Sequence, residues 1–203
     1  MNYYKIDPDI FSEKWAYGEV YSKCIKYDHT IKPITCPLCG RDIEGSKWIG
    51  TYDIIVNKKK LGDIIYGIPN LFLVSERFVS ACRKFNIKGF SNFIEVNLYY
   101  RSEKLDDRYF QTEINYSMKK VDFAKEQNRK RVTNKSLPKC SLCMKSGNGD
   151  LDNWKKIYFN EDLEFDIFKI YEKRGELYCN QNFVDFCRNN DITNIGNYFK
   201  EIY

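Results

Sequence analysis

The sequence predicts an α+β protein built from two similar halves, each with a Cys-x-x-Cys turn, strands, one helix and a closing strand. Two observations predict this class. Segments of similar sequence recur in the same order at a separation of about a hundred residues. Within each copy, strand-like alternation of apolar residues is followed by a single stretch with helical spacing. Strands and helices arranged in this way, without strict alternation, are typical of α+β folds.

The recurrence is most extensive between residues 78–87 and 183–192, where Phe, Val, Cys, Arg and Ile coincide at a separation of 105 residues (78 and 183). Small changes in separation elsewhere are what short loop insertions produce. We therefore predict a first repeat with an N-terminal extension at 1–118, a basic connector at 119–139 and a second repeat at 140–203. The other matching positions are Cys36 with Cys140, Cys39 with Cys143, Trp48 with Trp154, Asp63-Ile64 with Asp166-Ile167, and Asn92-Phe93 with Asn197-Tyr198.

The strands come first in each copy. Trp, Tyr and β-branched residues in near alternation predict strands at 47–57 and 154–159. A second apolar run predicts another strand at 71–74 and at 176–179. Closing strands are expected at 90–100 and 195–203.

One helix follows the second strand of each copy. Ser75 and Asn180 are good N-caps, because each side chain can accept a hydrogen bond from a free amide of the next turn. They predict helices over about 76–86 and 181–190, and Gly89 is expected to end the first helix in a left-handed conformation. Phe and Cys residues four positions apart share one face of each helix, which we expect to be buried. These residues are Phe78 with Cys82 and Phe183 with Cys187.

The composition is that of a folded protein. Hydrophobic residues make up 43% of the chain and aromatic residues 16%, more than a disordered chain carries. No stretch approaches the roughly eighteen apolar residues that a membrane span needs, and no apolar run follows a basic start at the N-terminus. We therefore expect a cytoplasmic protein with no membrane partner, in which the eight cysteines stay reduced.

The two Cys-x-x-Cys pairs, Cys36/Cys39 and Cys140/Cys143, are the strongest candidates for a functional site. A structural zinc ion binds four N or S ligands in a tetrahedron, and each pair offers two thiolates from one tight turn. We predict one zinc ion shared by the two halves, since separate sites would each need two more ligands. Zinc binding of roughly 10–16 kcal/mol exceeds the cost of closing a loop of about 100 residues, about 4 kcal/mol. The other candidate ligands are few: Cys24, His29, Cys82, Cys179 and Cys187.

Two other interpretations of the cysteine pairs stay open. The sequence Cys36-Pro37-Leu38-Cys39 has the form of a thioredoxin-type redox pair, but that chemistry needs one pair at a helix start rather than a pair in each half. Alternatively, the pairs are remnants of a former zinc site, because Met144 follows the second pair where Gly40 follows the first. We favour zinc.

The sequence holds no motif that indicates catalysis. It has no Gly-rich phosphate loop, no Gly-x-Ser-x-Gly turn and no His-Glu-x-x-His helix. The single histidine, His29, has no nucleophile at a telling spacing, and four cysteines would close the coordination shell of a zinc ion. We therefore do not expect an enzyme.

Two segments between the cysteine pairs, 63–67 (Asp-Ile-Ile-Tyr-Gly) and 73–78 (Leu-Val-Ser-Glu-Arg-Phe), carry a family resemblance. Together with the spacing of the pairs, they resemble the bacterial double-CXXCG motif family, first noticed as a paralogous set in myxobacteria. The likeness extends from about residue 36 to the end of the chain. The resemblance implies an immunity protein of a polymorphic or contact-delivered toxin system, which binds and neutralises a cognate toxin. It also implies that the four cysteines of the two pairs match the family's motifs.

The charge pattern motivates one alternative, a zinc-ribbon-like protein that binds nucleic acid. The net charge is +5, and residues 119–145 hold nine Lys or Arg against two acidic residues. The basic runs 58–60 and 129–131 are short, however, and residues 150–203 hold eleven acidic against seven basic residues. We therefore expect a toxin protein, rather than nucleic acid, as the partner.

Overall fold

The structure is a computed structural model of the whole chain. The described residues are 2–6, 20–26, 29–31, 34–35, 38, 42–44, 47–49, 53–65, 72–117, 121–125, 131–133, 154–159, 162–170, 176–195 and 199–202.

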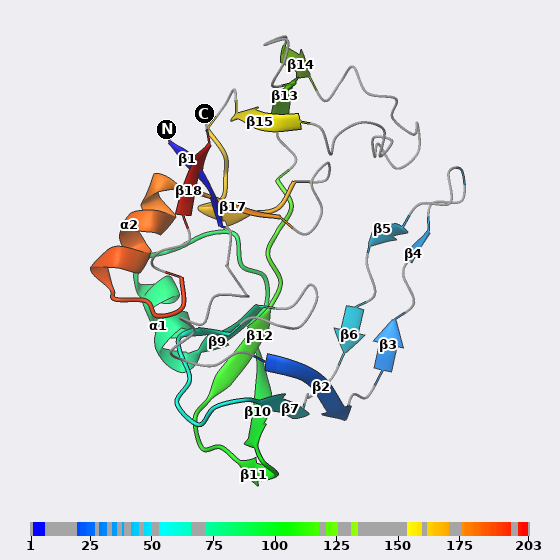
Figure 1. Cartoon of the computed structure of the whole chain (residues 1–203), viewed down its shortest axis with the longest axis vertical. Coiled ribbons are helices and arrows are strands. Elements are labelled where there is room, and N and C mark those ends of the chain that lie inside the picture. The colour runs from blue at the N-terminus through cyan, green and yellow to red at the C-terminus, as the bar shows by residue number, and fades with distance from the viewer. Residues whose placement is uncertain are drawn as a thin grey trace.

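Most of the described structure is strand, and two helices lie on one side of it, α1 (Glu76–Lys84) and α2 (Gln181–Asn189) (Figure 1). The predicted α+β class is confirmed. Both helices have nine residues, and no helix in the described part is long and apolar enough to cross a membrane. The strands are β1 (Tyr3–Ile6), β2 (Val20–Lys26), β3 (His29–Ile31), β4 (Ile34–Thr35), β5 (Asp42–Glu44), β6 (Lys47–Ile49), β7 (Asp53–Val56), β8 (Ile64–Ile65), β9 (Phe72–Ser75), β10 (Ile94–Tyr100), β11 (Glu103–Lys104), β12 (Tyr109–Thr112), β13 (Val121–Lys125), β14 (Arg131–Thr133), β15 (Trp154–Phe159), β16 (Ile167–Phe168), β17 (Leu177–Asn180) and β18 (Phe199–Ile202).

The larger sheet belongs to the first half of the chain and has the strand order β2-β7-β10-β12-β9-β8, with β11 paired to β10. β7 and β10 run parallel, with Ile54 opposite Leu98, whereas the other described neighbours are antiparallel. Because β7 and β10 are parallel, the segments that follow the two strands start at the same end of the sheet.

The second sheet joins the two ends of the chain. Its strand order is β16-β17-β1-β18, and Tyr3 of β1 lies opposite Asn180 on one side and Ile202 on the other. The N-terminal extension therefore completes the sheet of the second half, although the sequence groups it with residues 1–118. Both termini lie close together in Figure 1.

Three small sheets complete the described strands. β13 and β14 pair within residues 119–139, which the sequence predicts as a connector, and β13 also pairs with β15. This sheet extends the predicted strand 154–159 into a three-stranded unit. The other two sheets are the pairs β3–β6 and β4–β5.

Both helices begin at the predicted N-caps. The Ser75 side chain accepts from the amide of Phe78, and the Asn180 side chain accepts from the amide of Phe183, each at 3.1 Å. α1 and α2 end one or two residues before the predicted positions, and α1 does not end at Gly89. After α1 the residue in the left-handed conformation is Asn86 (φ 52°), and after α2 it is Asp191 (φ 49°).

The same backbone bonds close both helices. The amide of Ile87 donates to the Cys82 carbonyl at 3.0 Å, and the amide of Ile192 donates to the Cys187 carbonyl at 2.9 Å. These bonds, six residues to one, define the Schellman motif. Asn can take the left-handed position because its short polar side chain bonds locally, so no glycine is needed there.

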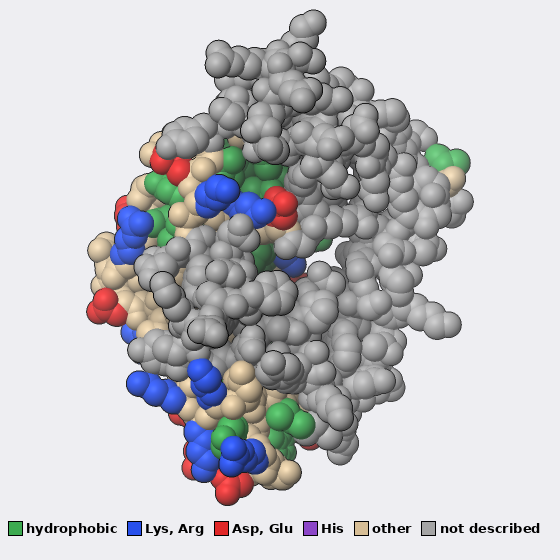
Figure 2. Space-filling view, in the orientation of Figure 1, with side chains coloured by type: hydrophobic (Ala, Val, Ile, Leu, Met, Phe, Trp, Pro, Cys, Tyr) green, Lys and Arg blue, Asp and Glu red, His purple; other side chains and the backbone are tan. Residues whose placement is uncertain are grey.

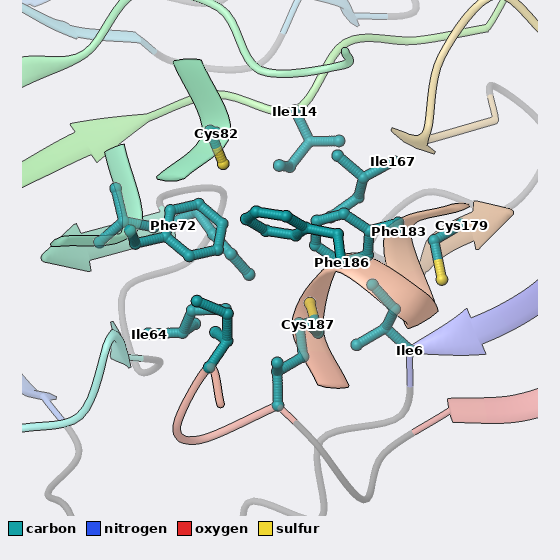
Figure 3. Close-up of a cluster of buried hydrophobic side chains, with 14 of the residues drawn as sticks. Ile6, Ile64, Phe72, Cys82, Ile114, Ile167, Cys179, Phe183, Phe186 and Cys187 are labelled. Carbon is teal, nitrogen blue, oxygen red and sulfur yellow. The ribbon is translucent and has the colours of Figure 1, made fainter. Parts of the chain in front are cut away.

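A hydrophobic core lies between the two helices and joins the two halves. The predicted buried residues of both helices, including Phe78 and Phe183, lie in one cluster together with residues of β1, β8, β9, β16 and β17. Figure 3 shows Phe72 and Ile64 of the first half facing Phe183 and Phe186 of the second. Edge-on aromatic contacts add to this packing, such as that between Phe78 and Phe186 at 5.9 Å. The two halves therefore share one core.

Candidate functional site

The four predicted zinc ligands, Cys36, Cys39, Cys140 and Cys143, lie outside the described residues. The strands that flank the first pair are described, since β4 ends just before it and β5 begins just after it, and the two strands are antiparallel partners. Among the described residues, no group of three or more His, Cys, Asp or Glu side chains is arranged to hold a metal ion. The zinc site therefore stays a prediction.

Of the other four cysteines, Cys24 lies in β2 and its side chain is outside the described part, whereas Cys82, Cys179 and Cys187 are free and buried. Burial raises the pKa of the Cys82 thiol to about 12, and it raises the pKa values of Cys179 and Cys187 further. Thiols with raised pKa values are poor nucleophiles and poor metal ligands at neutral pH, because both roles need the thiolate. These side chains serve as small hydrophobic core residues, as predicted for Cys82 and Cys187.

The most highly organised polar group in the described structure is the carboxylate of Asp63, which is only 5% exposed. It lies at the start of β8, next to the N-terminus of α1. Ser75 donates its hydroxyl to Oδ1 at 2.7 Å, and Arg77 donates its Nε–H to the same oxygen at 3.0 Å. Arg77 also donates an Nη2–H to Oδ2, so the guanidinium grips the carboxylate with two bonds.

Asp63 also binds the other half of the chain. The backbone amide of Thr193, in the turn after α2, donates to Oδ2 at 2.9 Å, and the Thr193 hydroxyl donates to the same oxygen at 3.0 Å. The Arg77 guanidinium extends this contact, because it donates to the carbonyl oxygens of Asn190 and Asp191 at 2.9 and 3.0 Å. One carboxylate thus connects the start of α1 with the end of α2.

The electrostatic balance at Asp63 favours the ionised form. Burial alone raises the pKa of this carboxyl, but hydrogen bonds from Arg77, Thr193 and Ser75 outweigh burial and bring the pKa below its ordinary value. The five hydrogen bonds occupy both oxygens, leaving little acceptor capacity for a substrate or metal ion. This carboxylate is an anchor between elements.

The second half contains a corresponding anchor at Asp166, at the start of β16. Its Oδ1 accepts from the side-chain amides of Asn180 and Asn182 at 3.0 and 2.9 Å. Its Oδ2 accepts from the backbone amide of Lys88, in the turn after α1, at 2.8 Å. Each aspartate therefore holds the N-terminus of its own half's helix and the turn that follows the helix of the other half.

The backbone bonds around the two anchors repeat the same arrangement. The amide of Ser75 donates to the Asp63 carbonyl at 2.9 Å, and the amide of Asn180 donates to the Asp166 carbonyl at the same distance. In both halves, the residue after the aspartate pairs with the strand that leads into the helix. Ile64 pairs with Val74 of β9, and Ile167 pairs with Cys179 of β17.

Gly89 allows a close approach between the halves. Its φ is 118°, and a Cβ built on it would lie 1.8 Å from the carbonyl oxygen of Ile167. At the corresponding place in the second half, the Asn194 side chain donates to the Ile64 carbonyl at 2.9 Å. The glycine is thus required by contact with the second half rather than by the end of α1.

The sequence contains a signal for the two aspartates of these anchors. The matching Asp-Ile pairs at 63 and 166 belong to the recurrence, and the sequence predicts Ser75 and Asn180 as N-caps. An aspartate stands 12 residues before Ser75 and 14 residues before Asn180, so each copy carries a carboxylate ahead of its helix start that can accept a bond from the cap. The bonds that link the two halves, from Thr193 to Asp63 and from Lys88 to Asp166, have no sequence signal, because they depend on how the two halves pack.

Comparison of the chain with known protein families found no matching family model, and comparison with curated proteins found no significant match.

Proposed function

We propose that this chain is a non-enzymatic immunity protein that binds and neutralises a cognate bacterial toxin, with its halves joined by one structural zinc ion. The observation that carries the proposal is the reciprocal anchoring by Asp63 and Asp166, which unites the two helices and their sheets around one core. A body held together in this way presents a preorganised surface, so binding loses little conformational entropy. The family resemblance of the sequence supplies the class of partner.

The segment that carries the resemblance has a structural explanation. Within Val-Ser-Glu-Arg-Phe, Ser75 caps α1, Arg77 holds Asp63 and the end of α2, and Phe78 lies fully buried in the core. These roles support a shared architecture for proteins with the motif. The surface that contacts the toxin is then free to differ.

We also propose that the two halves are copies of one duplicated unit. Support comes from the matched caps, helix ends and aspartate anchors, which recur at separations of 103 residues for the aspartates (63 and 166) and 105 for the caps (75 and 180). Both cysteine pairs then occupy equivalent places in the two units. Zinc bound by Cys36, Cys39, Cys140 and Cys143 would add a second link between the halves.

Co-expression tests the proposed function. The proposal expects a toxin gene next to this chain's own gene, and its product is induced in a bacterial host with and without the chain while growth is followed. We expect growth to be restored, with protection that increases with the ratio of chain to toxin and is complete only when the chain is in at least equal amount. Such stoichiometric protection is what a binding protein gives, whereas an enzyme acting on the toxin would protect at a small fraction of that amount.

A toxin variant with its catalytic residue replaced provides the control. The purified chain should form a one-to-one complex with this inactive toxin, because binding does not require toxin activity. Growth arrest despite soluble chain in excess over toxin would refute the immunity role.

A further inference from the structure

β1 takes the same place in the second half that β12 takes in the first. β12 lies between β9, which leads into α1, and β10, and it is antiparallel to both. β1 lies between β17, which leads into α2, and β18, and it is also antiparallel to both (Figure 1). The order along the chain differs, because β12 follows β10, whereas β1 comes before every other described strand.

Both strands have the same register against the strand that leads into the helix. Tyr109 of β12 lies opposite the helix cap Ser75, and Tyr3 of β1 lies opposite the helix cap Asn180. A slip of one residue would turn every side chain of a strand to the other face of its sheet. The two tyrosines therefore occupy corresponding positions in the two halves.

The register against the closing strand of each half agrees as well. The residue after each tyrosine is aromatic and lies opposite a glutamate, Phe110 opposite Glu95 of β10 and Tyr4 opposite Glu201 of β18. The two glutamates are 106 residues apart (95 and 201), close to the separation of 105 for the helix caps (75 and 180). β18 thus corresponds to β10, and β1 corresponds to β12.

The backbone bonds at the start of each helix also correspond. The first residue of α1, Glu76, donates its amide to the carbonyl of Arg108 at 3.0 Å, and the first residue of α2, Gln181, donates its amide to the carbonyl of Asn2 at 3.1 Å. Arg108 immediately precedes β12, and Asn2 immediately precedes β1. The first amides of a helix have no partner within the helix, so in both halves the same strand supplies one.

The hydroxyls of the two tyrosines bond to corresponding segments. Both side chains are buried, each in a hydrophobic cluster of its own half. The Tyr109 hydroxyl donates to the carbonyl of Gly62 at 2.7 Å, whereas the Tyr3 hydroxyl accepts from the amide of Leu163 at 3.1 Å. Gly62 and Leu163 lie just before the aspartate anchors at 63 and 166. The two tyrosines thus hold the same segment of each half, although one donates and the other accepts.

We infer that β1 is the closing strand of the second repeat, so that the chain is a circular permutation of a tandem duplication. Residues 2–6 belong with the second repeat by structure and with the first only by their position in the sequence. The inference rests on the proposed duplication and is independent of the immunity role. The permutation interlocks the halves, because they separate only if β1 leaves its place between β17 and β18.

The connection that precedes β12 in the first half runs over the surface of the molecule. Residues 101–104 and 106–108 are exposed, and Lys, Arg, Asp and Glu side chains gather at this end of the larger sheet in Figure 2. Exposed connections tolerate changes in length and linkage, whereas the place of a strand depends on its buried residues. A strand delivered through the same connection after β18 should therefore fill the place of β1.

Rescue of a damaged β1 by a strand appended after residue 203 tests the inference. The damaged chain is Tyr3→Ala/Ile6→Ala, which truncates two buried side chains of β1. The rescue variant is this damaged chain followed by a copy of residues 98–107 and then a copy of residues 2–6 with the native sequence. Because position 97 corresponds to 203 and position 108 to 2, the copied connection keeps the register of the first half. The matched control is identical, except that its appended strand also carries the two alanines.

Urea denaturation followed by circular dichroism measures the rescue. Tyr3→Ala/Ile6→Ala should lower the midpoint by at least about 1 M, because the two truncations leave cavities in two hydrophobic clusters. The native appended strand should recover at least about half of this loss at every protein concentration, because the hairpin is intramolecular. The alanine strand should recover none of it. If the damaged chain is unfolded, the same comparison is made by the appearance of a cooperative transition in the rescue variant.

Equal midpoints for the rescue variant and its control would overturn the circular permutation, and so would rescue that appears only at high protein concentration. Either result leaves the immunity role standing, because co-expression with the wild-type chain does not involve the appended strand. Failure of the wild-type chain to neutralise a toxin would overturn the immunity role without changing any of these midpoints.

Discussion

Substitution of Asp63 by Asn tests the anchoring network directly. The substitution keeps the size and shape of the side chain but replaces one carboxylate oxygen with an NH2 group and removes the charge. In the wild-type chain, Oδ1 of Asp63 accepts from Ser75 and Arg77, and Oδ2 accepts from Arg77 and Thr193. Whichever position the NH2 takes, it faces hydrogen-bond donors, so at least one buried contact becomes repulsive.

The expected loss of stability follows from these contacts. A hydrogen bond to a charged group contributes about 1.5–3 kcal/mol, and breaking a buried ion pair costs about 3–5 kcal/mol. The Arg77 side chain is 55% exposed, which lowers its share because water screens the pair. We therefore expect Asp63→Asn to lower the free energy of unfolding by about 2–4 kcal/mol.

Urea denaturation followed by circular dichroism measures this loss. With a slope of about 2 kcal/mol per M, the midpoint should fall by about 1–2 M. Asp106→Asn is the matched control, since Asp106 is exposed, and it should shift the free energy by less than about 0.5 kcal/mol. Equal midpoints for the two variants would refute the anchoring role of Asp63.

Three further predictions concern pH, backbone contact and thiol chemistry. The pKa of Asp63 is lower in the folded chain than in the unfolded one, so the stabilisation by its carboxylate is complete above about pH 4 and is lost as pH falls further. In acid titrations, the difference in unfolding free energy between wild type and Asp63→Asn should therefore shrink below about pH 4. Gly89→Ala should lower the free energy of unfolding by about 3 kcal/mol or more in urea denaturation, because its methyl group would meet the Ile167 carbonyl. The control Ser80→Ala, at an exposed position, should change the free energy of unfolding by less than about 0.5 kcal/mol. A mild effect at Gly89 would contradict the close contact. The three buried cysteines should not react with Ellman's reagent at pH 8 until the chain is unfolded, and their fast reaction in the native protein would disprove their burial.

Local features of the fold were predictable from the sequence. The N-caps at Ser75 and Asn180 and the strands before them follow from side-chain chemistry that acts within a few residues. The burial of Phe78 and Phe183 follows from helical spacing alone. These features depend on the nearest neighbours in the chain, so one sequence is enough to predict them.

Features that depend on the packing of distant segments were not predictable. The insertion of β1 into the sheet of the second half needs a partner almost the whole chain away. Gly89 has the sequence signature of a helix end, yet it is contact with Ile167 that requires a glycine there. The anchoring of Thr193 by Asp63 likewise arises only once both halves share a core.

The metal content of the purified chain tests most directly the central claim that the halves form one body around a shared zinc ion. We expect one zinc per chain by mass spectrometry, and near-complete loss of zinc in Cys36→Ser and also in Cys140→Ser, although these variants change different halves. The same loss from either substitution is expected because both pairs complete a single tetrahedron. Two zinc ions per chain, or half of the wild-type content in each variant, would contradict the shared site.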